Sequence, residues 1–215
     1  MSERTIVHLL RHGEVHNPEK ILYGRLPGYH LSEVGRKMAE RAGEYFAARD
    51  VAAVVASPLE RAQQTAAPVA AAHNLTIRTD ERIIESTSVF EGHEFGPDAA
   101  ALRYPRAWRH LRNPFRPSWG EAYAVIAIRM HAAAETARDE VRGREAVLVS
   151  HQLPIWIARL AAEHRRLWHD PRRRECALAS VTSLTYEGDH VVAVDYTEPA
   201  ADLVPIAKNA EERGA

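Results

Sequence analysis

The chain contains a single cysteine, Cys176, so it cannot form an internal disulfide. This scarcity is typical of proteins that fold in a reducing compartment. No run of apolar residues approaches the roughly 20 that cross a membrane. The first apolar run, residues 5–10, ends at Arg11 and is too short for the core of a signal peptide. We therefore expect a cytoplasmic protein without a membrane partner.

The chain also has little excess of positive or negative charge. The 28 Lys and Arg residues nearly balance the 29 Asp and Glu residues, and the formal net charge is -1. This balance gives no electrostatic reason to expect a nucleic-acid partner. A basic run at residues 164–174 could form a nucleic-acid patch, but we interpret it as a solvated face with Trp168 packed inward. It could also add positive potential near the mouth of a site.

The pattern of apolar residues predicts an α/β protein. A chain of 215 residues with 46% hydrophobic residues suits a single domain, residues 1–215. Aliphatic and β-branched runs predict strands at residues 5–10, 52–56, 76–79 and 146–149, with a final pair at 180–186 and 191–196. Helices are predicted at residues 32–49, 57–73, 121–142 and 153–164, the first capped by Ser32 and the second by Ser57 with Pro58 at its first position. This alternation predicts a three-layer sandwich, a mostly parallel central sheet flanked by helices on both faces.

A stretch around residues 86–120 interrupts the alternation. It is rich in glycine and proline, and we expect one helix, at about residues 98–111, inside it. A long excursion from a compact domain is usually functional and often acts as a lid. Its aromatic residues could line a substrate site or form the small core of a lid; they are Phe90, Phe95, Trp108, Phe115 and Trp119.

Polar residues follow three of the predicted strands. Arg11 and His12 follow the first strand, Ser57 the second with Arg61 shortly after it, and His151 the fourth. Ligands of such sheets bind beyond the carboxyl ends of the strands, so these side chains should converge there. Two arginines and two histidines suit a dianionic phosphoryl group. A neutral histidine can also attack phosphorus and form a phosphohistidine.

At these residues the sequence resembles the histidine phosphatase superfamily, the phosphoglycerate mutase-like proteins. The resemblance covers at least residues 5–152. Its specific segments are Leu10-Arg11-His12-Gly13-Glu14, Gly24-Arg25-Leu26-Pro27, Leu31-Ser32-Glu33-Val34-Gly35, Ser57-Pro58-Leu59-Glu60-Arg61-Ala62 with Thr65, and Val149-Ser150-His151. It implies the phosphoglycerate mutase-like form of the three-layer fold.

The resemblance also implies how phosphate is bound and attacked. His12 would be the phosphorylated nucleophile. Arg11, Arg61 and a protonated His151 would hold the phosphoryl oxygens. Asn17, one residue earlier than the family's asparagine, would be a further phosphate ligand.

A carboxyl group must protonate the leaving oxygen and then activate water. The resemblance assigns this role to Glu85, and Glu91 is the alternative donor. Glu121 and Arg129 resemble a supporting motif before the last catalytic strand.

These residues predict a phosphatase that hydrolyses phosphate monoesters through a phosphohistidine on His12. Its substrate would be a small-molecule phosphate ester and its product inorganic phosphate. The first alternative is a cofactor-dependent phosphoglycerate mutase, and the second is a catalytically inactive module that binds phospho-ligands. Family mutases carry an Arg-x-Tyr-Gly type segment after the acid, whereas Ser86-Thr87-Ser88-Val89 follows Glu85 here, which favours the phosphatase.

Neither a metal nor a cofactor is expected. His8, His12 and His16 are spaced by four residues, but this spacing brings ligands together only on a helix, and this segment is predicted as strand and loop. The strand at 191–196 could be a sheet edge used by a homodimer.

Overall fold

The computed structural model describes residues 4–93 and 120–204, and these residues contain one six-stranded sheet with the order β3-β2-β4-β1-β5-β6. The strands are β1 (Arg4–Arg11), β2 (Val51–Ala56), β3 (Ile77–Thr79), β4 (Glu145–Ser150), β5 (Val181–Glu187) and β6 (His190–Thr197). The first four strands run parallel to one another, while β5 is antiparallel to β1 and β6 is antiparallel to β5. The prediction of a mostly parallel sheet is confirmed.

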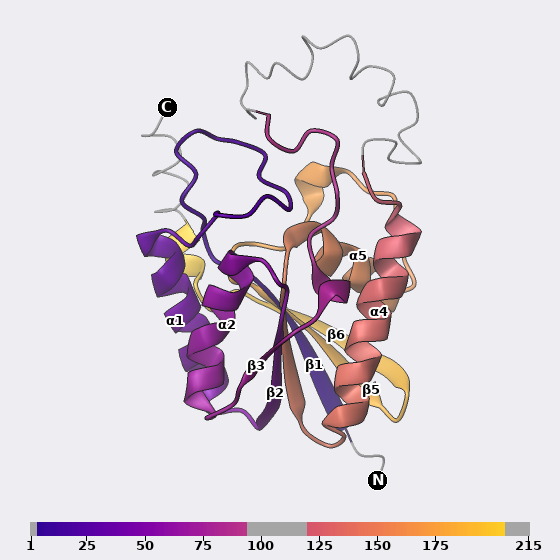
Figure 1. Cartoon of the computed structure of the whole chain (residues 1–215). Helices are drawn as coiled ribbons and strands as arrows, with labels where there is room; N and C mark the ends of the chain where they lie inside the picture. The colour runs from indigo at the N-terminus through magenta and orange to yellow at the C-terminus, as the bar shows by residue number, and fades with distance from the viewer. Residues whose placement is uncertain (1–3, 94–119, 205–215) are drawn as a thin grey trace.

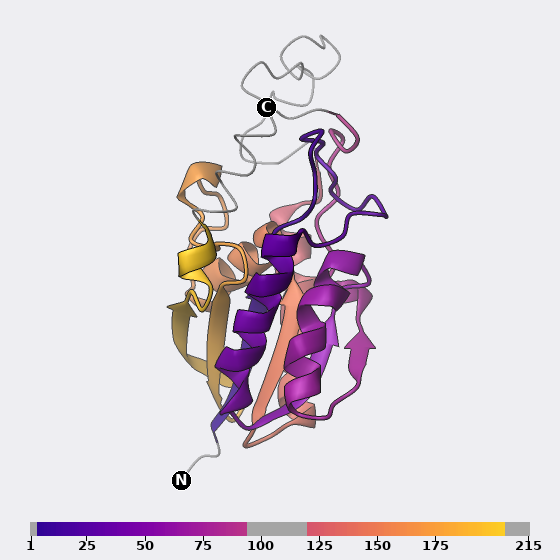
Figure 2. The same cartoon turned by 90° about the vertical axis from the view of Figure 1, so that its left-hand side faces the viewer.

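Helices cover both faces of the sheet (Figures 1 and 2). They are α1 (Glu33–Ala47), α2 (Glu60–Ala72), α4 (Tyr123–Glu140) and α5 (Gln152–Ala162), with short 3-10 turns η1 (Glu81–Ile83), η3 (Pro171–Arg173) and η4 (Ala201–Leu203). Along β1, Val7 and Leu9 pack into the core under α4 and α5, whereas Leu10 packs into the core under α1 and α2. Successive strand residues point to opposite faces, so a strand buried on both faces is a continuous apolar run. The three-layer prediction is therefore confirmed.

The predicted start of the second helix is wrong. Helix α2 begins at Glu60, with Leu59 at the N-cap position, rather than at Pro58. The reason is that Ser57 still continues strand β2 at the carboxyl end of the sheet, since its N–H donates to the carbonyl of Val149 at 2.9 Å. Its hydroxyl lies 2.8 Å from His151 Nε2, so Ser57 contacts a side chain at the end of β4 instead of capping the helix.

Trp168 does not pack inward as expected, because 52% of its surface is exposed. The buried tryptophan of this region is instead Trp156 of α5, whose ring lies 5.9 Å from that of His169. Among the described residues, no helix combines the length and the apolar character that crossing a membrane requires.

The excursion is described only at its two ends. Residues 94–119, with the expected helix at 98–111 and four of the five aromatic residues, lie outside the described residues. Ser88 and Gly120 pair in an isolated antiparallel bridge, and the N–H of Glu121 donates to the carbonyl of Thr87 at 3.4 Å. The two sides of the excursion are therefore joined at residues 88 and 120, while residue 93 pairs with Leu22, whose N–H donates to the carbonyl of His93 at 2.9 Å. The single domain and the lid remain predictions.

Candidate active site

The loops after β1, β2 and β4 meet at the carboxyl end of the parallel strands, the upper end of the sheet in Figure 1. Hydrogen bonds continue the ladder past the strands, since the N–H of His12 donates to the carbonyl of Ser150 at 3.1 Å. This arrangement places the ring of His12 beside the ring of His151, with centroids 5.2 Å apart. The convergence that the strand pattern predicted is therefore present.

His12 is held in one tautomer. Its Nδ1 lies 2.7 Å from the carbonyl oxygen of Gly13, and a carbonyl can only accept, so Nδ1 carries the proton. This leaves a lone pair on Nε2. His12 is 2% exposed. Burial lowers the pKa of His12 well below its usual value, and the charges of Arg61 and Arg11 lower it further. The ring is therefore neutral and nucleophilic at neutral pH.

Two glycines allow the loop of His12 to lie directly on α1. A Cβ on Gly13 would come within 2.6 Å of the carbonyl oxygen of Gly35, and a Cβ on Gly35 would collide with the backbone of Glu14. From the other side, the N–H of Gly13 donates to Thr65 Oγ1 at 3.1 Å, and that hydroxyl donates to the carbonyl of Arg61 at 2.7 Å. The nucleophile loop is thus fixed to both α1 and α2.

Arg61 and Arg11 present buried donors without partners. Arg61 is 0% exposed, lies over the ring of Tyr23 at 4.7 Å, and donates from Nη2 to the carbonyl of Gly24 at 2.7 Å. Arg11 donates from Nη1 to the carbonyl of Cys176 at 2.6 Å. Nε and Nη1 of Arg61 and Nε of Arg11 are buried and have no hydrogen-bond partner among the described residues. Buried unpaired donors are costly, so these atoms mark a place for an anion.

His151 is buried beside them in a neutral state. Its Nε2 lies 2.8 Å from Ser57 Oγ, and its Nδ1 has no partner within the described part of the chain. Burial lowers the pKa of His151, and the charges of His12, Arg61 and Arg11 lower it further. The expected protonated His151 is therefore disfavoured in the free protein, and only an incoming anion would favour the cation.

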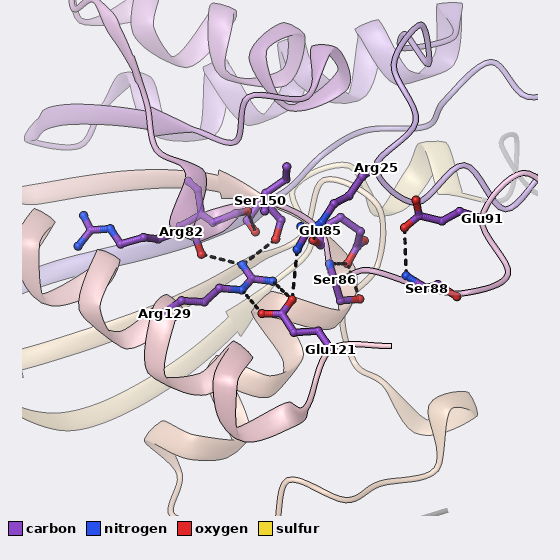
Figure 3. A network of polar contacts seen from close by, with 11 residues as sticks. Arg25, Arg82, Glu85, Ser86, Ser88, Glu91, Glu121, Arg129 and Ser150 are labelled. Atoms are coloured by element: carbon purple, nitrogen blue, oxygen red, sulfur yellow. Dashed lines mark hydrogen bonds and ion pairs between the residues drawn. The ribbon is translucent and has the colours of Figure 1, made fainter. Parts of the chain in front are cut away.

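The two candidate acids differ in their surroundings (Figure 3). Burial raises the pKa of Glu85, against the opposing effects of the Ser86 N–H and of Arg61 and Arg11. Its carboxylate accepts from the N–H of Ser86 at 2.8 Å. Glu91 instead accepts from the N–H of Ser88 at 3.1 Å (Figure 3). A partly buried carboxyl whose pKa is raised, close to Arg11 and Arg61, is the better candidate for a general acid, which favours Glu85.

The backbone that carries Glu85 is clamped by side chains (Figure 3). Arg129 Nη1 donates to the carbonyls of residues 82 and 84, both at 2.7 Å. Ser150 Oγ donates to the carbonyl of residue 83 at 2.7 Å, and Arg25 Nε donates to that of residue 85 at 2.6 Å. Glu121 holds both arginines, with Arg129 at 2.8 and 3.0 Å and Arg25 at 3.2 Å. Four successive carbonyls are thus fixed, which the sequence had indicated only as a supporting motif.

Asn17 uses its side chain within its own loop. Its Nδ2 donates to the carbonyl of Ile21 at 2.9 Å, and its Oδ1 accepts from the N–H of Ile21 at 3.0 Å. Binding of phosphate by Asn17 would require these bonds to open, and this role remains a prediction.

The histidine spacing does not build a metal site. His8 is buried near the opposite end of the sheet, where it bonds to Ser183 Oγ at 2.8 Å and to Glu145 Oε2 at 2.9 Å. In the described part of the chain, no three His, Cys, Asp or Glu side chains are grouped as metal ligands would be.

Known proteins share both the sequence pattern and the fold. The family model of the histidine phosphatase superfamily (branch 1) matches residues 7–199. The uncharacterized protein Rv0525 of Mycobacterium tuberculosis (strain ATCC 25618 / H37Rv) is 59% identical over 201 residues, which are 94% of this chain and 100% of that protein. The probable phosphoglycerate mutase GpmB of Yersinia pestis (strain Pestoides F) is 29% identical over 187 residues, which are 81% of this chain and 83% of that protein.

A solved structure gives the same result. The mycobacterial glucosyl-3-phosphoglycerate phosphatase Rv2419c matches with a TM-score of 0.70 and 25% identity, over 90% of this chain and 96% of that one. The resemblance seen in the sequence is thereby confirmed, and the chain belongs to the histidine phosphatase superfamily.

Proposed function

We propose that this protein is a phosphatase that hydrolyses small-molecule phosphate monoesters through a phosphohistidine on His12. The observation that carries the proposal is a neutral His12, fixed in one tautomer, beside buried donors of Arg11 and Arg61 that lack partners. A dianionic phosphoryl group supplies the acceptors that these donors need. The relative that is a glucosyl-3-phosphoglycerate phosphatase supports hydrolysis as the outcome.

In the first step the substrate phosphate lies between Arg11, Arg61 and His151. His12 Nε2 attacks phosphorus in line with the ester bond, so an N–P bond forms while the ester P–O bond breaks. Glu85 gives its proton to the leaving oxygen, which departs as an alcohol. The Gly13 carbonyl, still bonded to Nδ1–H, stabilises the positive charge that develops on the ring.

In the second step Glu85, now a carboxylate, takes a proton from water. The water oxygen bonds to phosphorus, the N–P bond breaks, and the electron pair returns to His12 Nε2. Inorganic phosphate then leaves. Positioning and charge stabilisation supply most of the rate gain in phosphoryl transfer. Because cationic side chains stabilise the phosphoryl oxygens, we expect activity to persist in the presence of a chelator.

A cofactor-dependent phosphoglycerate mutase is the second candidate, favoured by the similarity to the probable mutase GpmB. A mutase would use the same His12 but return the phosphoryl group to a sugar acid instead of water. The segment after Glu85 argues against this candidate, because it lacks the Arg-x-Tyr-Gly type sequence that such mutases carry. A catalytically inactive binding module would not need a buried carboxyl with a raised pKa at the position of Glu85.

The test compares wild type with His12→Asn in a phosphate-release assay with p-nitrophenyl phosphate, with and without chelator, and in an isomerisation assay with 3-phosphoglycerate. We expect chelator-resistant hydrolysis that falls by at least about 1,000-fold in His12→Asn, because the covalent step is lost. His16→Ala is the matched control, since His16 lies exposed a few residues away. Isomerisation without hydrolysis would establish the mutase, and activity in neither assay would support the binding module.

A further inference from the structure

Arg174 lies on the segment between α5 and β5, close to the candidate active site. Two residues later on this segment, the carbonyl of Cys176 accepts from Arg11 Nη1 at 2.6 Å, so the segment is fastened to a phosphate-binding arginine. The guanidinium of Arg174 also interacts electrostatically with Glu85. The charges that act on His12 are instead those of Arg61 and Arg11. Arg174 therefore lies near enough to Glu85 for its charge to act on that carboxyl.

Two side chains hold the guanidinium of Arg174 in position. Its Nε donates to His169 Nε2 at 2.8 Å, and it hydrogen-bonds to Tyr123 at the start of α4. His169 is itself fixed, because its Nδ1 lies 2.8 Å from the carbonyl of Leu167 and its ring packs at 5.4 Å from that of Tyr123 and at 5.9 Å from that of Trp156. Since Nε donates to His169, the bond to Tyr123 uses an outer nitrogen, and within the described residues three of the five N–H donors of Arg174 remain for a further acceptor.

Arg174 also differs from its neighbours in charge pairing. Arg172 pairs with Asp170 at 2.8 Å, and Arg159 pairs with Glu163 at 2.9 Å. Arg174 is partly buried, yet no carboxylate lies within ion-pair distance of it among residues 4–93 and 120–204. The charges of three arginines, Arg61, Arg11 and Arg174, therefore act on the carboxyl of Glu85. A dianionic phosphoryl group held by Arg11 and Arg61 leaves one cation without a counter-charge.

The position of Glu85 indicates which part of a substrate Arg174 would contact. Under the proposed function, Glu85 protonates the leaving oxygen, so a cation beside Glu85 lies next to the leaving group. We propose that Arg174 binds a second anionic group, a carboxylate or a further phosphate, on the leaving group, and so selects phosphate esters of acidic alcohols. This inference rests on the proposed phosphatase activity and adds a specificity-determining residue to it.

The experiment measures phosphate release from two pairs of substrates. The first pair is 3-phosphoglycerate and glycerol 3-phosphate, which differ by a carboxylate on the leaving group. The second is fructose 1,6-bisphosphate and fructose 6-phosphate, which differ by a second phosphate. For each enzyme the readout is the ratio of kcat/KM within a pair, because any change in the acidity of Glu85 affects both members. The variants are Arg174→Gln and Arg174→Lys, with Arg173→Gln as the control, since Arg173 is an exposed neighbour of the same charge.

We expect Arg174→Gln to lower the ratio for at least one pair by about 10- to 100-fold, the effect of one charge-assisted hydrogen bond, mostly through KM. Arg174→Lys should restore part of the ratio, and Arg173→Gln should change it less than about twofold. A fall in the first pair alone identifies a carboxylate, and a fall in the second alone identifies a phosphate. Ratios that stay at the wild-type value in Arg174→Gln, or that fall equally in Arg173→Gln, overturn the inference while the phosphatase proposal stands. Hydrolysis of no substrate by wild type overturns both.

Discussion

Two side chains with opposite pKa shifts set the pH range of the proposed chemistry. Burial raises the pKa of Glu85 and lowers the pKa of His12. The reaction needs Glu85 protonated and His12 unprotonated. A raised pKa keeps the acid protonated to higher pH than a solvated glutamate, and a lowered pKa keeps the nucleophile free to lower pH. For alkyl phosphates, whose leaving oxygen needs a proton, we expect kcat/KM to be highest between the lowered pKa of His12 and the raised pKa of Glu85, and to fall as Glu85 ionises.

Glu85→Gln tests this assignment. The variant should lose about 100- to 1,000-fold in kcat with an alkyl phosphate and lose its dependence on pH in the alkaline range, because no acid remains to titrate. The loss in the rate of forming the phosphohistidine should be smaller with p-nitrophenyl phosphate, whose leaving group needs little protonation. Glu91→Gln is the control. If Glu91→Gln carried the loss and Glu85→Gln did not, the donor would be Glu91.

At the scale of elements, the acid depends on a clamp that joins distant parts of the chain. Arg129 of α4 fixes the carbonyls of residues 82 and 84, and Glu121 fixes Arg129. Arg129→Ala removes the donor of these carbonyls and leaves the Glu121 carboxylate with Arg25 alone, which should lower the free energy of unfolding by about 1–3 kcal/mol. It should also displace Glu85, so activity should fall more for alkyl phosphates than for p-nitrophenyl phosphate.

The discriminating measurement for the clamp is the ratio of those two activities. Arg78→Ala is the matched control, because Arg78 also pairs with α4, through Glu140, but on an exposed surface. Arg129→Lys should recover stability better than activity, since a lysine cannot reach both carbonyls with the geometry of the guanidinium. An unchanged activity ratio in a folded Arg129→Ala variant would show that Glu85 does not need the clamp.

The elements also show why some features could be predicted from sequence and others could not. The buried strands β1 and β4 were predictable because both their faces are apolar, and Arg11, His12 and His151 could be placed because they lie where those strands end. The start of α2 was mispredicted because Ser57-Pro58 has the composition of a helix cap, while its hydroxyl lies against His151. That pairing exists only after folding.

The side chains that clamp the backbone of residues 82–85 could not be predicted from the sequence for the same reason. Arg25 meets the backbone of Glu85 across 60 residues of sequence, and Ser150 meets residue 83 across 67. Neither arginine nor serine has a local signal for such a contact. The resemblance named Glu121 and Arg129 as a motif, but only the tertiary packing shows that they hold the backbone beside Glu85. The support of Arg174 by His169 and Tyr123 was likewise outside the reach of sequence patterns.

At the scale of the whole molecule, a nearly neutral protein concentrates unpaired cations in one place. A bound anion should therefore stabilise the fold, because it binds the native state alone. At a phosphate concentration about 100 times its Kd, the gain is about 2.7 kcal/mol, or a rise of roughly 5–10 °C in Tm for a protein of this size. Thermal unfolding in phosphate, compared with sodium chloride of equal ionic strength, measures this effect.

Arg61→Met is the informative variant in this experiment. It removes a fully buried cation with two unpaired nitrogens and fills similar space. In phosphate-free buffer its Tm should equal or exceed that of wild type, and the rise in phosphate should be largely lost. A Tm well below wild type in phosphate-free buffer would show that the contacts of Arg61 with Tyr23 and Gly24 outweigh the cost of its burial.

The bridge between Ser88 and Gly120 has a consequence for how this protein can diversify. The two sides of the excursion are joined at this bridge, where a Cβ on Gly120 would collide with the carbonyl of Thr87, so the junction is closed tightly. The cost of closing a loop grows only slowly with its length. The chain between residues 93 and 120 can therefore be lengthened or shortened at little cost, while the backbone of Glu85 stays fixed just before the junction. Length changes in this part of the sequence are therefore compatible with an unchanged arrangement of His12, Arg61 and Glu85.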